Sequence, residues 1–322
     1  MKVLIVRTSS LGDLVHMLPA ISDMAKQVPN VQIDWVVEAA FADIPTWHPA
    51  VNEVITISQR QWRKAWWQPS VWAARRAVVQ HIKKAQYDVV IDMQALLKSI
   101  RWVCAAQGIK HGLDWQSARE SLCSLFYDRK HRVAFWQPAV TRQRLLASLV
   151  WGYEVTGAPD FGLQRFVDLA KKHPSELPYA VIMPSASRAD KLWAASHWQQ
   201  VFDRLQQHGL ALKLLAGNDT ENAYSHTLIS GRENATVLPR LGLTAVAEVL
   251  CGASVMVGLD SGLTHLSAAL GRNTIGIYKA STPVRTPLVG SGLTASLGDR
   301  GRPPAVQEVL TTLERFFNTA LI

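Results

Sequence analysis

The sequence predicts an α/β protein of two Rossmann-like, doubly wound parallel-sheet domains. Its 322 residues suggest two domains, at roughly 150 residues per domain. Short apolar runs alternate with helical stretches, which is typical of a parallel sheet with helices on both faces. This alternation fades over 157–178, where Pro159, Pro174 and Pro178 fall, and then starts again.

The domain limits follow from that interruption. We expect a first domain over 1–165, a linker over 166–178 and a second domain over 179–302. Ligands of such sheets bind beyond the carboxyl ends of the strands. Two domains of this kind are expected to face each other across a cleft that holds the site.

The first half carries four apolar runs short enough to be buried strands. They are Lys2–Val6, Ile33–Val37, Val54–Ile57 and Val89–Ile91. Helices are predicted between and after them at Leu14–Val28, Trp72–Ala85 and Leu96–Ala106.

The second half repeats the pattern. Strands are predicted at Tyr179–Met183, Ala211–Leu215, Thr236–Leu238, Val255–Val257 and Thr274–Tyr278. Helices are predicted at His197–Gln207, Glu221–Ser230, Thr244–Cys251 and Thr264–Leu270. A last helix is expected to start after Pro303-Pro304, because Val306 to Phe317 places apolar residues on one face.

Composition excludes several classes of protein. Hydrophobic residues make up 48% and charged residues 18%, so the chain is not globally disordered. Three scattered cysteines do not indicate a disulfide framework or a zinc site. No apolar run approaches the roughly 18 residues needed to cross a bilayer. The ten histidines never pair at metal-ligand spacing, so no metal is expected. We expect a cytoplasmic protein, free or bound at a membrane surface.

The positive charge is concentrated in one region. The chain has a formal net charge of +9, and residues 60–144 alone hold 16 basic and 5 acidic residues. Ten of the twelve tryptophans lie before residue 166. This combination indicates an anionic partner, such as a phosphorylated substrate, an anionic membrane or nucleic acid. The alternative is a solvated basic face.

Three loops at strand ends are candidate sites. Asp260-Ser261-Gly262-Leu263-Thr264-His265 opens a helix, where backbone N–H groups can bind a diphosphate, although Asp260 could simply cap the helix. Ser185 to Trp193 brings hydroxyls and Lys191 to the end of a strand. Thr8 to Asp13 offers Asp13 as a general base or as a routine cap. A helix start lowers the pKa of a carboxylate and weakens it as a base, so burial or a nearby anion would have to offset this.

One motif is set aside. Gly290 to Ala295 matches the dinucleotide-binding pattern GxGxxA, but no predicted strand and helix flank it.

Five stretches resemble the heptosyltransferases of glycosyltransferase family nine. They are VLIVRTSSLGDLVHMLPA, RQWRKAWW, HGLDWQSARESLCSLFYDRKH, ADKLWAASHW and DSGLTH, and the resemblance spans essentially the whole chain. It implies the GT-B fold and metal-independent, inverting transfer of L-glycero-D-manno-heptose from ADP-heptose to the first Kdo of Kdo-lipid A. No cofactor is implied. The implied location is the cytoplasmic face of the inner membrane.

The resemblance also implies roles for individual residues. Asp13 would be the catalytic base. The donor would be bound by Ser185, Ser187, Lys191, Glu221, Asp260, Ser261, Gly262 and His265. The acceptor would be bound by Arg60, Arg63, Lys64 and Arg119. The C-terminal helix 303–320 would pack back on the first domain. Where family members often carry two adjacent threonines, this chain has Ala186-Ser187, so the donor hydroxyls are less certain than Lys191.

Two other readings stay open. The chain could be a different sugar transferase of the same fold, such as heptosyltransferase II or a Kdo transferase, because fold does not decide between them. It could also bind nucleic acid through 60–144, although no recognised nucleic-acid-binding module is present.

Overall fold

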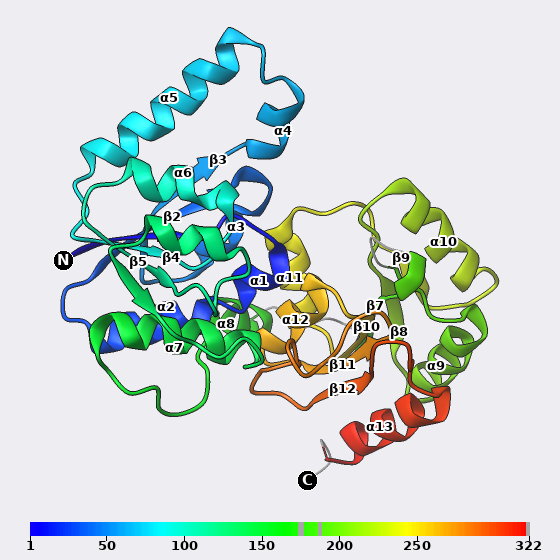
Figure 1. The fold of residues 1–322 in the computed structure, drawn as a ribbon. Helices are drawn as coiled ribbons and strands as arrows, with labels where there is room; N and C mark the ends of the chain where they lie inside the picture. The colour runs from blue at the N-terminus through cyan, green and yellow to red at the C-terminus, as the bar shows by residue number, and fades with distance from the viewer. Residues whose placement is uncertain (173–176, 186–188, 320–322) are drawn as a thin grey trace. The chain divides into compact units, whose positions relative to one another are not determined.

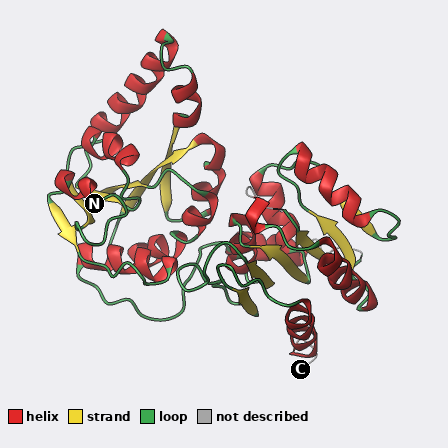
Figure 2. Cartoon of the chain, turned by 45° about the vertical axis from the view of Figure 1, so that its right-hand side comes forward, coloured by secondary structure: helices red, strands yellow, loops and turns green. Residues whose placement is uncertain are grey.

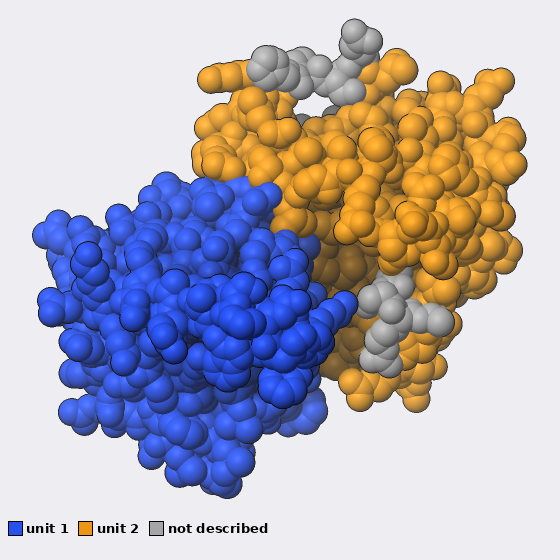
Figure 3. Space-filling model, turned by 90° about the horizontal axis from the view of Figure 1, so that it is seen from above, with its two compact units in different colours: residues 1–162 blue, residues 163–322 orange. Residues whose placement is uncertain are grey.

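The computed structural model divides the chain into two compact units, Met1–Gly162 and Leu163–Ile322 (Figure 3). It describes residues 1–172, 177–185 and 189–319. Each unit holds one sheet of six strands with helices packed around it (Figure 2). The predicted α/β class is thereby confirmed.

The sheet of unit 1 has the strand order β3-β2-β1-β4-β5-β6, and every pair is parallel. Its strands are β1 (Lys2–Val6), β2 (Gln32–Glu38), β3 (Val51–Ile57), β4 (Val89–Asp92), β5 (Ile109–Leu113) and β6 (Arg129–His131). At its centre Ile5 pairs with Trp35 on one side and with Ile91 on the other. Helices cover both faces of β1, so its run of apolar residues is buried.

The helices of unit 1 include α3, α4 and α7, which were not predicted, and one predicted helix is divided in two. They are α1 (Leu11–Val15), α2 (Leu18–Gln27), α3 (Asp43–Trp47), α4 (Gln59–Lys64), α5 (Pro69–Lys84), α6 (Leu97–Ala105) and α7 (Ala139–Trp151), with a 3₁₀ helix at Ser121–Phe126 (Figure 1). The helix predicted at Leu14–Val28 is two helices, because Pro19 lacks an N–H and is tolerated only in a first turn.

Unit 2 repeats the strand order of unit 1. Its sheet runs β12-β11-β10-β7-β8-β9, again with every pair parallel. The strands are β7 (Tyr179–Met183), β8 (Ala211–Leu214), β9 (Ala235–Val237), β10 (Val255–Leu259), β11 (Asn273–Tyr278) and β12 (Thr294–Gly298). In both units the direction of winding reverses between two central strands, β1 and β4 in one and β7 and β10 in the other. Ligands of doubly wound sheets bind at this reversal.

The helices of unit 2 bring two corrections. They are α8 (Gln164–Lys172), α9 (Ala195–Gln207), α10 (Asp219–Ile229), α11 (Leu243–Cys251), α12 (Gly262–Ala269) and α13 (Val306–Thr319), with a 3₁₀ turn at Ala189–Lys191. Much of the expected linker over 166–178 is helix α8, which packs against α11. The C-terminal helix was expected on the first domain, and this expectation is wrong. Its residues Val309, Leu313 and Phe316 belong to the core of unit 2, because α13 covers α9, β11 and β12.

Candidate functional site

Asp13 is held at both oxygens of its carboxylate. Ser10, which precedes α1, donates its backbone N–H and its hydroxyl to Oδ2 at 3.0 and 3.1 Å. The Arg7 guanidinium lies 2.9 Å from Oδ1. The Asp13 side chain is nevertheless 42% exposed, whereas that of Arg7 is 10% exposed. The carboxylate is therefore fixed in place and still reachable by a substrate.

The groups around Asp13 determine whether its carboxyl is ionised at neutral pH. Burial raises the pKa of Asp13, but Arg7, the Ser10 N–H and His16 together outweigh burial, so the pKa lies below its ordinary value of 3.8. The expected offset by burial or a nearby anion is therefore not found, because the pKa stays low and the strongest charged neighbour is the Arg7 cation. At neutral pH Asp13 is a carboxylate that can accept a proton.

The loop after β4 clamps the loop after β1. The Gln94 Oε1 accepts the N–H and hydroxyl of Thr8 at 2.8 and 2.7 Å, and its Nε2 donates to the Ser9 carbonyl at 3.0 Å. Asp92, fully buried, accepts the N–H groups of Gln94 and Ala95 and so fixes the turn. Sequence reasoning did not single out Arg7, Gln94 or Asp92 as parts of this arrangement.

A basic pocket of about 400 Å³ adjoins Thr8 and Ser9. Its lining residues are Thr8, Ser9, Glu38, Gln59, Arg60, Arg63, Lys64 and Lys98. Three of the four predicted acceptor residues are therefore brought together. The fourth, Arg119, is exposed and does not line this pocket.

The cations of this pocket are crowded. Lys98 donates from Nζ to the Ser9 hydroxyl at 2.7 Å, and burial together with the Arg60 charge lowers the pKa of Lys98. Glu38, the one carboxylate of the lining, accepts the N–H groups of Gln59 and Arg60 and so fixes the start of α4. Because the cations outnumber the carboxylate, an anion entering the pocket would be stabilised.

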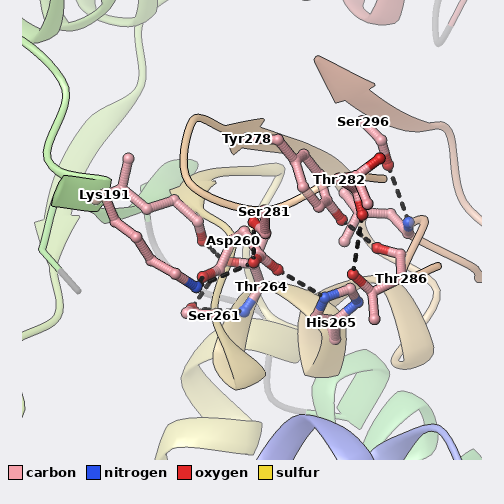
Figure 4. A network of polar contacts seen from close by, with 12 residues as sticks. Lys191, Asp260, Ser261, Thr264, His265, Tyr278, Ser281, Thr282, Thr286 and Ser296 are labelled. Atoms are coloured by element: carbon pink, nitrogen blue, oxygen red, sulfur yellow. Dashed lines mark hydrogen bonds and ion pairs between the residues drawn. The ribbon is translucent and has the colours of Figure 1, made fainter. Parts of the chain in front are cut away.

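In unit 2, Asp260 is the centre of a polar network at the end of β10 (Figure 4). The Lys191 ammonium donates to the Asp260 carbonyl at 2.8 Å and to Oδ2 at 3.0 Å. The Nε2 of His265 lies 3.2 Å from Oδ1, and the Ser281 hydroxyl donates to Oδ2. Lys191 follows β7 and Asp260 follows β10, so the network spans the reversal in strand order.

This network is suited to holding a diphosphate. Burial raises the pKa of Asp260, but His265, Ser281 and Lys191 hold it well below its ordinary value, so Asp260 stays charged and orients its partners. An ammonium has three N–H donors, and Lys191 uses two on Asp260. Ser261 caps α12 by accepting the Thr264 N–H, while the first backbone N–H groups of a helix have no partner within it.

The other predicted donor residues lie at the same edge of this sheet. Ser185 follows β7 and is 2% exposed, and its hydroxyl has no hydrogen-bond partner among the described residues. Glu221, near the start of α10 after β8, accepts the Gly217 N–H and the Asn218 amide, each at 2.8 Å. Gly262 is the first residue of α12. Ser187, and Ala186 before it, lie outside the described residues.

A second pocket, of about 610 Å³, adds cations that sequence reasoning missed. Its lining residues are Asp190, Lys279, Ala280, Arg300, Gly301 and Pro303. Asp190 precedes Lys191 and Ala280 precedes Ser281, so this pocket adjoins the Asp260 network. No short motif marks Lys279 or Arg300, since each follows a different strand.

Gly290 to Ala295 is not a dinucleotide site. The stretch leads into the edge strand β12. A side chain at Gly290 would collide with the Ala268 carbonyl, so the glycine permits close packing of a loop on α12.

The described part of the chain holds neither a metal-binding cluster nor a membrane-spanning helix. Among residues 1–172, 177–185 and 189–319, no group of three or more His, Cys, Asp or Glu side chains could hold a metal ion. Over the same residues, no helix is both long enough and apolar enough to span a membrane.

Comparison with known proteins places these features in context. Residues 75–313 match the model of glycosyltransferase family 9 (heptosyltransferase). The chain is 43% identical to lipopolysaccharide heptosyltransferase 1 of Salmonella typhimurium over 88% of this chain and 90% of that protein. It matches the structure of E. coli heptosyltransferase WaaC with ADP at 38% identity and a TM-score of 0.89, over 98% of this chain and 99% of the other. The same enzyme with ADP-2-deoxy-2-fluoro heptose matches at 38% identity and a TM-score of 0.86, over 99% of this chain and 100% of the other.

Proposed function

Because this chain belongs to glycosyltransferase family 9, the heptosyltransferases, we propose that it transfers heptose from ADP-heptose to the first Kdo of Kdo-lipid A. Heptose transfer in lipopolysaccharide core biosynthesis is the activity of this family branch, and a nucleotide-sugar donor agrees with relatives crystallised with ADP and an ADP-heptose analogue. The Kdo acceptor and the membrane surface are the finer parts of the proposal.

The observation that carries the donor half is the Asp260 network. The donor's diphosphate gains negative charge as the bond from phosphate oxygen to heptose breaks. Lys191 has an N–H donor left after its bonds to Asp260, and it stands beside the first backbone N–H groups of α12. Donors arranged in advance stabilise such charge without having to reorganise. Glu221 and Ser185 would bind the ribose and the sugar side of the donor.

Asp13 supports the acceptor half as a general base. The carboxylate would take the proton from the attacking Kdo hydroxyl, whose oxygen then bonds to the anomeric carbon of heptose. ADP leaves from the opposite face, so the configuration inverts. The products are the glycosidic bond, ADP and a proton held first by Asp13.

The acceptor is proposed to enter through the basic pocket. Kdo-lipid A carries carboxylates and phosphates, and Arg60, Arg63, Lys64 and Lys98 line a pocket of unit 1 next to the loop that carries Asp13. Guanidinium and ammonium groups bind such anions through charge-assisted hydrogen bonds. Arg119 stays a proposed acceptor contact outside this pocket.

Binding at a membrane surface is supported by exposed tryptophans on the α4–α5 corner. Trp66 and Trp67 are 59% and 63% exposed. Beside them, the Arg75 guanidinium lies over the rings of Trp62 and Trp72, at 5.8 and 5.7 Å from their centroids. Aromatic rings alternating with cations suit the headgroup region of an anionic bilayer. The basic charge of 60–144 is accounted for in this way without nucleic acid as a partner.

The decisive experiment is a turnover assay with ADP-heptose and a panel of acceptors. We expect product with Kdo-lipid A and none with an acceptor that already carries the first heptose. Preference for the heptosylated acceptor would indicate heptosyltransferase II, and a Kdo donor replacing ADP-heptose would indicate a Kdo transferase. Tight, salt-sensitive DNA binding without turnover would contradict the proposal altogether.

The membrane surface has its own test. Trp66→Ser with Trp67→Ser should reduce co-sedimentation with phosphatidylglycerol vesicles, while turnover of a soluble, deacylated acceptor stays unchanged. Trp136→Ser is the control, because Trp136 is 68% exposed but lies outside the α4–α5 corner. Equal vesicle binding by the double variant and the wild type would rule out this corner.

A further inference from the structure

Arg7 is a buried cation for which the helix cap alone gives no reason. It directly follows β1 and is only 8% exposed. Its guanidinium donates to the Met93 carbonyl, beyond β4, and pairs with the Asp13 Oδ1 at 2.9 Å. Its own carbonyl accepts the Trp35 indole N–H at 2.9 Å. One side chain thus ties together two strand ends and the carboxylate.

The cap of α1 does not require this cation. Ser10 already donates its N–H and its hydroxyl to Oδ2 of Asp13. Removing a guanidinium from water is costly unless it is paired and hydrogen-bonded. What Arg7 adds is an ion pair at the other oxygen, Oδ1, and a positive charge that opposes the effect of burial, which favours the neutral form of the carboxyl.

We propose that Arg7 is a positioning residue for the base: it fixes Oδ1 of Asp13 and keeps the carboxylate ready to accept the acceptor's proton. Gln94 supports it by holding Thr8 and Ser9, the two residues that follow Arg7. The inference rests on the proposed function, because it concerns the group that removes the proton.

Other charged groups face Asp13 and set the background for the test. His16, at the end of α1, acts on Asp13 in the same direction as Arg7. Lys98, from α6, is within electrostatic reach of Asp13, Arg7 and Arg60, and its Nζ donates to the Ser9 hydroxyl. Both remain when Arg7 is replaced, so the change caused by Arg7→Met belongs to Arg7.

The experiment is a pH profile of kcat/KM for the acceptor in matched variants. An arginine beside a carboxylate lowers its pKa by roughly 1–3 units. Arg7→Met should therefore raise the pKa of Asp13 and move the acidic limb of the profile to higher pH, so that kcat/KM falls by roughly 10-fold or more at a pH where the wild type is still flat. The donor KM should change less than about 3-fold, since the donor residues lie in unit 2.

Arg144→Met is the matched control. Arg144 is another buried arginine of unit 1, and its guanidinium pairs with Asp23 at 2.7 and 3.1 Å. Its loss should lower stability without moving the pH profile. Should Arg7→Met fail to fold, Arg7→Lys against Arg144→Lys decides. Lysine keeps the positive charge but lacks the planar guanidinium with its paired N–H donors. Arg7→Lys should therefore lower kcat about 3- to 10-fold, with little change in the acidic limb of the pH profile.

A double variant tests whether Arg7 acts through Asp13, and it distinguishes failure of the proposal for Arg7 from failure of the assignment of Asp13 as the base. If Arg7 acts through Asp13, adding Arg7→Met to Asp13→Asn should cost less than about 2-fold beyond Asp13→Asn alone. A loss of rate in Arg7→Met that is uniform at every pH, or both a wild-type rate and a wild-type profile in Arg7→Lys, would overturn the proposal for Arg7 only. Normal turnover by Asp13→Asn would instead overturn the assignment of the base.

Discussion

Asp13 accepts hydrogen bonds from Ser10 at Oδ2 and forms an ion pair with Arg7 at Oδ1, and this determines what a conservative change there should do. Asp13→Asn keeps one oxygen for Ser10 but cannot take up a proton. We expect kcat to fall by roughly 10²–10⁴-fold, the usual contribution of a general base. The affinity for ADP, measured by calorimetry, should hardly change. A variant with near-normal turnover would leave Asp13 as a helix cap.

Lys191 supports a second prediction at the residue scale. Lys191→Ala removes the cation beside Asp260 and should weaken ADP and ADP-heptose by a similar factor, roughly 10- to 100-fold, as expected for a hydrogen bond to a charged group. Lys213→Ala is the control, because its Nζ lies over the Tyr179 ring, 3.5 Å from the centroid, and lines a different pocket. Unchanged ADP affinity in Lys191→Ala would remove Lys191 from the donor site.

Sequence reasoning found the residues that lie in short motifs and missed those that contact a loop far away in the sequence. Asp260, His265 and Lys191 were predicted and lie in one network. Gln94 and Lys98 were not, because each reaches a loop more than eighty positions earlier in the chain. Spacing along a sequence carries no sign of such contacts, since they depend on which strands become neighbours.

At the scale of elements, the packing of α13 in the core of unit 2 can be tested by substitution. Leu313 is fully buried in the core of unit 2. Leu313→Ala should lower the free energy of unfolding by about 2–5 kcal/mol, measured by urea denaturation, because it leaves a cavity. Asn318→Ala, at an exposed position of the same helix, should change it by less than about 0.5 kcal/mol. Equal stability of the two variants would show that the apolar face of α13 is not part of the core of unit 2.

The central strands could be predicted, as could the edge strands β3 and β9, whereas β5, β6 and β12 could not. β1, β7 and β10 are buried on both faces and therefore appear as continuous apolar runs. β6 consists of Arg129, Lys130 and His131, and β5 includes Lys110 and His111, so neither has an apolar run. Gly290 and Gly292 precede β12, and glycines are typical of a loop. In β6 and β12 few side chains are buried, which leaves little apolar pattern to detect.

At the scale of the whole molecule, acid should act first on unit 1. Burial lowers the pKa of His48 to about 4, and burial together with His131 lowers the pKa of His111 to about 4. Above pH 6.5 both are neutral whether folded or unfolded. As the pH falls from 6.5 to 4, only the unfolded chain takes up these protons, so stability falls, by roughly 3 kcal/mol for His48.

Urea midpoints at pH 7 and pH 5 measure this effect. His48→Gln can keep hydrogen bonds to Ser22 and Ala50 and should reduce the difference between the two midpoints. His226→Gln, on the exposed face of α10, should leave it unchanged. If His48→Gln were as acid-sensitive as the wild type, the loss of stability would have another origin.

The repeated strand order has a consequence for how such enzymes diversify. Each unit closes its own sheet around its own reversal point, and the predicted acceptor and donor residues fall in different units. Substitutions in unit 1 can therefore change the acceptor specificity without altering the predicted donor-binding residues of unit 2. A chimaera that takes residues 1–162 from a relative with another acceptor should inherit that acceptor and still consume ADP-heptose.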